Sequence, residues 1–263
     1  MNSPAAGNHA GLLLLLPPAG TRVVVAGGCG GIGRAFVAAA QAAQLELVVL
    51  DLERSIAAAP PPPGVLAIAC DALHEDQVQR ALGEVGAHWG ACDALVNLVG
   101  YTHERTPVER LPSAQWDDIV DGTLRSAFLL SREVIPLLKA GRAPSMVHTS
   151  STFGVRVSMP GYAPYAAAKA GVINLVRALA TELAPAVRVN AVAPGVVDTA
   201  FLQGGTGQQE KLERIDPAQF AASVPLRRVG QPSDIVGPLL FLIGPGSAYM
   251  TGQTLHINGG IWS

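Results

Sequence analysis

Short, continuous runs of apolar residues recur along the chain and alternate with longer segments that have helical spacing. The apolar runs are rich in β-branched residues and are not interrupted by polar ones, as is typical of parallel strands covered on both faces. The resulting βαβα order predicts an α/β fold with a doubly wound parallel sheet. The expected strands are 23–26, 45–50, 65–70, 94–98, 146–148, 187–192 and 254–257, and the expected helices are 32–44, 75–88, 113–139, 164–183 and 232–243.

Two segments depart from this pattern. The four prolines at 60–63 leave room for little helix after Glu53, so the second crossover is expected to be short. Residues 199–223 are rich in glycine, glutamine and charged residues, and we expect this long segment to form a lid over the strand ends. The remaining pattern predicts one three-layer α/β/α domain of the Rossmann type over 22–263, preceded by an N-terminal extension over 1–21.

The composition favours a small-molecule partner. The chain has 263 residues, of which 49% are hydrophobic and only 14% are charged, and its net charge is −2. No basic field is present to attract nucleic acid or an anionic membrane. Low charge combined with many alanines and glycines leaves apolar helix faces to cover, so we expect a homo-oligomer, a tetramer or a dimer.

The cysteines and the first residues carry no sign of export or metal binding. Cys29, Cys70 and Cys92 are odd in number and lack ligand-like spacing, which argues against disulfides and metal sites. The leucine run at 12–16 is too short for a membrane span, and no lysine or arginine precedes it as in a signal peptide. These features predict a cytoplasmic protein.

A glycine-rich turn at 26–33 directly follows the first expected strand and opens the first expected helix. Such octets are often only flexible turns, but in this context glycines let the backbone approach a pyrophosphate at a helix N-terminus. We therefore expect a dinucleotide here. The expected cofactor-binding residues of the turn are Gly27, Cys29, Gly31, Ile32 and Gly33.

An acidic residue follows the second expected strand. Asp51 stands about twenty residues beyond the glycine turn, where a carboxylate can accept hydrogen bonds from the adenosine ribose. Its charge would repel a 2′-phosphate, and the glycine turn contains no lysine or arginine, so NAD is preferred over NADP although Arg54 is close. The alternative is a solvated turn residue. Asp71, after the third strand, is a candidate for the adenine pocket or for a helix cap.

Tyr165 and Lys169 are spaced i, i+4, which places phenol and ammonium on one helical face. A free tyrosine has a pKa near ~10, and a nearby cation lowers it by stabilising the phenolate. The hydroxyl-rich stretch 149–151 follows the fifth expected strand, so Ser151 is expected to face Tyr165 and hold a substrate oxygen. These three residues predict proton transfer.

Together these motifs resemble those of the short-chain dehydrogenase/reductase family, over residues 22–260. Ordered agreement among independent motifs is more specific than any one of them. The residues that carry the resemblance are the glycine turn, Asp51, the Asn97-Leu-Val-Gly100 stretch, the Ser150-Ser151-x-x-Gly154 turn, Tyr165-x-x-x-Lys169, Asn190-Ala-Val-Ala-Pro194-Gly195 with Thr199, Thr251-Gly-Gln253, and Asn258-Gly-Gly260.

The resemblance implies an NAD(H)-dependent oxidoreductase that moves a hydride between nicotinamide and a secondary alcohol or ketone. It implies that Tyr165 exchanges the substrate proton, that Lys169 lowers the pKa of that tyrosine and binds the nicotinamide ribose, and that Ser151 orients the substrate oxygen. Family members are commonly tetramers. The cofactor residues that it adds are Asn97 and Gly100 on the adenosine side, and Pro194, Gly195 and Thr199 beside the nicotinamide carboxamide.

Three positions depart from the family pattern. Thr123 stands where the family has an asparagine that positions a relay water, Ala26 replaces a threonine, and Leu98 replaces a second asparagine. Threonine can bond back to a carbonyl of its own helix, so the local bend is expected to persist. Thr123 is kept as a catalytic candidate, and the alternative function is a non-catalytic dinucleotide sensor or scaffold.

Overall fold

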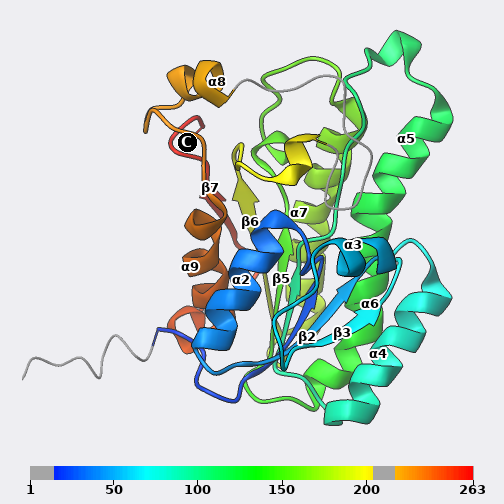
Figure 1. Cartoon of the computed structure of the whole chain (residues 1–263), viewed down its shortest axis with the longest axis vertical. Coiled ribbons are helices and arrows are strands. Elements are labelled where there is room, and N and C mark those ends of the chain that lie inside the picture. Colours follow the sequence, from blue (N-terminus) through cyan, green and yellow to red (C-terminus); the bar gives the residue numbers. More distant parts are fainter. Residues whose placement is uncertain (1–14, 204–216, 263) are drawn as a thin grey trace, which may run out of the picture.

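A computed structural model describes residues 15–203 and 217–262. The strands form one parallel sheet in the order β3-β2-β1-β4-β5-β6-β7 (Figure 1). Chain order runs outward in both directions from β1, which confirms the doubly wound α/β fold. The strands are β1 (Arg22–Ala26), β2 (Glu46–Asp51), β3 (Leu66–Ala69), β4 (Ala94–Asn97), β5 (Ser145–Thr149), β6 (Arg188–Pro194) and β7 (Thr254–Ile257).

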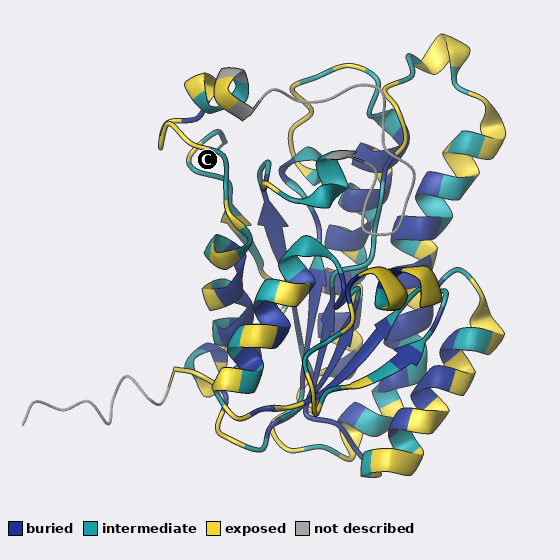
Figure 2. Cartoon of the chain, in the orientation of Figure 1, coloured by how far each residue is buried: buried dark blue, intermediate teal, exposed yellow. Residues whose placement is uncertain are grey.

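The helices lie on both faces of the sheet and form the two outer layers. Figure 2 shows the inner strands almost wholly buried between helices whose outer faces are exposed, whereas the edge strands β3 and β7 are only partly buried. The short α3 before the prolines agrees with the expected small second crossover. The helices are α2 (Gly31–Ala42), α3 (Glu53–Ala58), α4 (Glu75–Trp89), α5 (Ser113–Val120), α6 (Ser126–Lys139), α7 (Ala163–Leu183), α8 (Pro217–Ser223) and α9 (Pro232–Ile243).

Each face of the sheet has its own hydrophobic core. Val24 of β1 belongs to the core shared with α4, α6 and α7, whereas its neighbour Val25 belongs to the core shared with α2 and α9. Both side chains are fully buried. Successive strand residues point to opposite faces, so a strand covered on both sides must be apolar throughout, as the sequence pattern indicated.

Two expected segments differ in detail from the structure. The expected helix over 113–139 is helical throughout, but a π-turn over Asp121–Arg125 divides it into α5 and α6. In the expected lid, a 3₁₀ turn covers Ala200–Gln203 and α8 follows, whereas residues 204–216 lie outside the described residues. The weak periodicity of the expected lid did not indicate α8.

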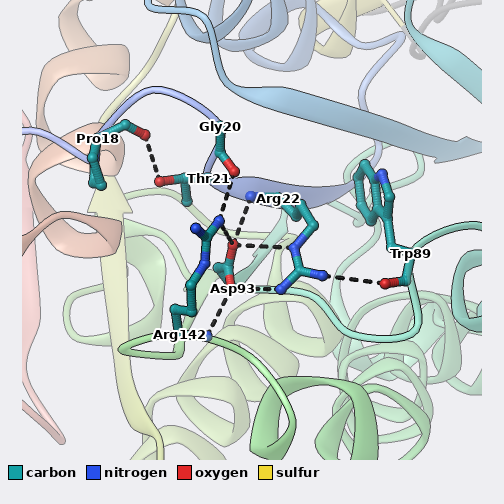
Figure 3. Close-up of polar contacts among 7 residues, drawn as sticks. All are labelled: Pro18, Gly20, Thr21, Arg22, Trp89, Asp93 and Arg142. Carbon is teal, nitrogen blue, oxygen red and sulfur yellow. Dashed lines mark hydrogen bonds and ion pairs between the residues drawn. The ribbon is translucent and has the colours of Figure 1, made fainter.

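A charged cluster closes the amino-terminal edge of the sheet (Figure 3). The carboxylate of Asp93 is 3% exposed, and it accepts hydrogen bonds from the backbone N–H groups of Arg22 (2.9 Å) and Arg142 (2.7 Å). It also pairs with both guanidinium groups, at 3.1 and 3.2 Å. Arg142 donates further to the Gly20 carbonyl, so the cluster connects β1, the loop after α6 and the residues before β1.

Candidate active site

Loops after the carboxyl ends of the strands enclose a cavity of about 840 Å³. It lies where the strand order reverses, which is the usual ligand position in doubly wound sheets. Most of the residues expected at the site therefore meet in one place. Those that line the cavity are Gly27, Gly31, Ile32, Gly33, Asp51, Gly100, Ser151, Tyr165, Lys169, Pro194, Gly195 and Thr199.

The glycine turn lets its backbone approach neighbouring groups closely. Gly27 has a φ of +80°, a conformation that favours glycine. A Cβ on Gly33 would lie 2.3 Å from the Gly27 carbonyl oxygen, and one on Gly31 would lie 2.5 Å from the Cγ2 of Thr199. The turn thus brings the start of α2 to the cavity wall, where the first N–H groups of a helix lack partners within the helix.

Cys29 contributes to this turn through its backbone. Its side chain is fully buried in the core beside α2 and is absent from the described residues lining the cavity. Its N–H donates to the Asp51 carboxylate at 2.8 Å, and burial raises the pKa of the thiol to about 12. The thiol is therefore not the ligand-facing group that its place in the turn suggested.

Asp51 stands between the main cavity and a second cavity of about 810 Å³. One carboxylate oxygen accepts the Cys29 N–H and the other accepts the Leu52 N–H, both at 2.8 Å, while burial raises its pKa. Asp51 is thus held rigidly at the junction and is not a solvated turn residue. Asp71 and Arg54 line the second cavity only.

Asp71 does not cap a helix. The N-cap position of α4 is His74 without a side-chain cap, and the Asp71 carboxylate instead accepts the Leu73 N–H at 3.1 Å. The helix-cap interpretation of Asp71 is therefore wrong.

Tyr165 and Lys169 lie on one face of the first turns of α7, as the spacing predicted. Their exposed fractions are 9% and 3%, and the Lys169 Nζ lies 5.7 Å from the centre of the tyrosine ring. Nζ donates to the Thr149 carbonyl at 2.7 Å. The carboxyl end of β5 thus fixes the ammonium beneath the phenol.

Burial dominates the protonation of both groups. It lowers the pKa of Lys169 to about 7 and raises the pKa of Tyr165 to about 12, although a hydrogen bond with Ser151 acts to lower the latter. The sequence led us to expect a tyrosine pKa below its ordinary value. In this structure the desolvation of the phenolate outweighs the stabilisation that its neighbours supply.

The two neighbouring serines after β5 have different roles. Ser151 precedes the 3₁₀ turn Thr152–Gly154, where its Oγ accepts the Phe153 N–H at 3.2 Å and interacts with the Tyr165 phenol. Ser150 instead donates from its Oγ to the Lys169 carbonyl at 2.8 Å and so ties α7 to β5. The structure thus brings Ser151, as expected, to the tyrosine.

Asn97 supports the site from below. It is buried and absent from the described residues lining either cavity; its Nδ2 lies 3.1 Å from the Nδ1 of His148, and its Oδ1 accepts the Val99 N–H. The Asn97 side chain therefore holds His148 and the residues after β4 in place, and it does not line the cavity expected to hold the cofactor. His148 is fully buried and bonds onward to Ser131, and burial lowers its pKa to about 4, as in a neutral core histidine.

Thr123 lies in the π-turn over Asp121–Arg125, at the place where a local bend was expected. The bond back to the helix is made by Ser126, whose Oγ donates to the Gly122 carbonyl at 2.9 Å, and the buried Thr123 Oγ1 has no partner. A Cβ on Gly100 would lie 2.9 Å from the Lys169 Nζ and 3.6 Å from the Thr123 Oγ1. The unpaired hydroxyl thus lies across Gly100 from the ammonium.

The loop 101–104 lines both cavities. The Tyr101 hydroxyl donates to the Asp118 carboxylate at 2.7 Å, and the His103 Nε2 lies 2.5 Å from the other oxygen of that carboxylate. Tyr101 packs over Gly122, where a Cβ would lie 2.3 Å from its ring.

The fold and this site define an oxidoreductase of the Rossmann class. A family model described as Enoyl-(Acyl carrier protein) reductase matches residues 27–262. The 3-oxoacyl-(acyl-carrier-protein) reductase FabG of Staphylococcus aureus is 34% identical over 197 residues, which are 74% of this chain and 76% of that protein. The corresponding reductase of Thermotoga maritima is 35% identical over 187 residues, 71% and 72% of the two chains.

Solved structures agree with this assignment. A short-chain dehydrogenase/reductase of Brucella melitensis, titled glucose/ribitol dehydrogenase, has a TM-score of 0.84 at 30% identity and covers 94% of this chain and 99% of its own. The aldohexose dehydrogenase of Thermoplasma acidophilum has a TM-score of 0.81 at 26% identity, covering 92% and 94%. The chain belongs to the short-chain dehydrogenase/reductase family.

The described part of the chain holds neither a candidate membrane span nor a candidate metal site. No helix there is long and apolar enough to cross a membrane, and no group of histidine, cysteine and acidic residues there could hold a metal ion. The three cysteines are free and buried.

Proposed function

We propose that this chain is an NAD(H)-dependent oxidoreductase that moves a hydride between nicotinamide and a secondary alcohol or ketone. The observation that carries the proposal is that Tyr165, Lys169 and Ser151 line the same cavity as the glycine turn. Nicotinamide supplies the hydride chemistry when it is bound, and the protein supplies binding, orientation and the proton.

The cavity walls fit an extended dinucleotide. The N-terminus of α2 would hold the pyrophosphate, and Asp51 would accept hydrogen bonds from the adenosine ribose. The close approach of Gly31 to Thr199 supports one continuous wall from the phosphates to the carboxamide end. Gly100 and Asp71 would flank the adenosine, and Pro194, Gly195 and Thr199 the carboxamide.

Tyr165 would exchange the proton of the substrate oxygen while Ser151 holds that oxygen by a hydrogen bond. With its pKa at about 12, the phenol keeps its proton at pH 7, which suits donation to a ketone during reduction. Alcohol oxidation requires phenolate, and the Lys169 ammonium beneath the ring would stabilise it. The Thr149 carbonyl keeps the ammonium in place for this purpose.

We propose NAD rather than NADP as the cofactor. The Asp51 carboxylate would face a 2′-phosphate at close range, and residues 26–33 contain no cation to offset the repulsion. Arg54 lines the second cavity and is the one arginine or lysine among its described lining residues. The proposal expects a higher kcat/KM with NAD(H) than with NADP(H) on the same substrate.

Replacing Tyr165 by phenylalanine tests the proposed function. Tyr165→Phe removes one oxygen from the site, so it should bind NADH normally but lower turnover on the order of 10²- to 10⁴-fold. Binding is followed by nicotinamide fluorescence, and turnover by nicotinamide absorbance across a panel of secondary alcohols and ketones. Tyr249→Phe is the matched control, because Tyr249 is fully exposed. Near-normal activity of Tyr165→Phe would refute the mechanism, and NADH binding without Tyr165-dependent turnover would favour the sensor or scaffold.

We also propose a homo-oligomer, a tetramer or a dimer. Trp116 on α5 and Phe128 on α6 are large apolar side chains with exposed fractions of 38% and 45%, and such surfaces are commonly covered by association. Sedimentation velocity tests this, and a monomer at micromolar concentration would contradict it. The cytoplasmic location also stays a prediction.

A further inference from the structure

The part of the cavity beyond Tyr165 has an apolar, largely aromatic wall. Its residues come from segments far apart in the chain: the 3₁₀ turn after β5, the loop before α7, the 3₁₀ turn Ala200–Gln203, α8 and the residues after β7. Only the fold brings them together. The side chains that form this aromatic wall are Phe153, Met159, Tyr162, Phe201, Phe220 and Ile261.

Rings of the aromatic wall lie next to Tyr165. The ring centre of Tyr165 lies 6.5 Å from that of Phe153 and 6.0 Å from that of Phe201, and the ring centre of Tyr162 lies 5.0 Å from that of Phe153. A substrate oxygen within hydrogen-bond reach of Tyr165 and Ser151 places its carbon beside these rings. The substituents on that carbon therefore contact aromatic faces and edges.

Polar side chains at this end of the cavity lie mainly at its rim. Arg105, Arg156, Ser158 and Ser223 also line the cavity, but all four are exposed. The hydroxyl groups of a polyol would lose their hydration against Phe153 and Phe201 and find few partners there. A flat apolar group has no hydrogen bonds to water to lose, and removing its surface from water would be favourable.

We propose that the substrate carries an aromatic group on the reacting carbon, so that the enzyme interconverts aryl-substituted secondary alcohols and the matching ketones. This inference rests on the proposed function and adds the substrate class. In oxidation, bound NAD⁺ would accept the C–H hydride and the Tyr165 phenolate would accept the hydroxyl proton and release it to solvent, so that the products are the ketone, NADH and one proton. The class differs from the sugars named in the titles of the two structural relatives.

The test compares NAD-linked oxidation of 1-phenylethanol and of ribitol, two secondary alcohols that differ in the group beside the reacting carbon. The aromatic wall predicts a kcat/KM at least ~10-fold higher for 1-phenylethanol. Phe153→Ala and Phe201→Ala should each lower that kcat/KM by roughly 10-fold and leave the Kd for NADH unchanged. Tyr249→Ala, which removes a fully exposed ring outside both cavities, should change neither value.

Binding to the enzyme–NADH complex separates the possible failures. Calorimetry should detect acetophenone binding to the wild-type complex and weaker binding to the two phenylalanine variants, whose thermal midpoints verify folding. A preference for ribitol, or no acetophenone binding to an enzyme that binds NADH and turns over through Tyr165, would overturn the substrate class alone. Loss of NADH binding or of any Tyr165-dependent turnover would overturn the proposed function as well.

Discussion

Asp93 should contribute a measurable part of the stability of the fold. Burial acts to raise the pKa of this carboxyl, but its two arginine partners and two backbone N–H groups together hold it at about 2, against 3.8 for the free group. A lowered carboxyl pKa means that the ionised form stabilises the folded state at pH values above 3.8. The difference between these two pKa values corresponds to about 2 kcal/mol at pH 7.

Asp93→Asn removes the charge and keeps the shape, so we expect it to lower the free energy of unfolding by about 2–3 kcal/mol at pH 7. The contribution is lost as the pH falls from 3.8 toward 2, so the difference from wild type should shrink to about half by pH 3. Urea unfolding at one protomer concentration measures both values, since association also stabilises folded chains.

Asp117→Asn is the matched control, because Asp117 is exposed; it should stay within about 0.5 kcal/mol of wild type. A loss below about 0.5 kcal/mol in Asp93→Asn at pH 7, or a loss that is the same at pH 3, would refute the reasoning. Either result would mean that the arginines hold Asp93 without stabilising its charge (Figure 3).

Three further predictions concern the site itself. Gly33→Ala should weaken NADH binding at least ~10-fold, because the added Cβ would lie 2.3 Å from the Gly27 carbonyl oxygen; titration of nicotinamide fluorescence measures this, and unchanged affinity would contradict the turn geometry. Cys29 should resist iodoacetamide with and without NAD, since its thiol is buried with a pKa of about 12; labelling of the native protein seen by mass spectrometry would argue against the packing. Thr123→Asn should raise kcat several-fold with little change in NADH affinity, because a longer amide can reach past Gly100 toward Lys169; an unchanged kcat would refute a part for an amide at this position in proton transfer.

Most of the fold could be predicted because local pattern and tertiary environment agree. The strands read as unbroken apolar runs since helices cover both faces, and α9 begins and ends at the expected residues 232 and 243. The sequence pattern did not indicate the π-turn over Asp121–Arg125. A π-turn keeps helical periodicity on either side, so hydrophobic spacing does not reveal it.

In the candidate site, too, the sequence predicted local features but not those that depend on the whole fold. The i, i+4 pair of Tyr165 and Lys169 is local, so spacing alone put both groups on one face. Burial is a property of the whole fold, and therefore neither the raised tyrosine pKa nor the core position of the Cys29 thiol could be predicted. The aromatic wall is assembled from distant segments, and Ile261 carried no signal in the sequence that linked it to Phe153.

The loop that follows β4 has a consequence for attempts to alter this enzyme. This loop, residues 101–104, lines both cavities. Asp118 holds it in place through its contacts with Tyr101 and His103. A substitution that weakens these contacts is therefore expected to change the size of both cavities at once. Selecting for a new substrate through this loop is therefore expected to shift the preference for the dinucleotide as well.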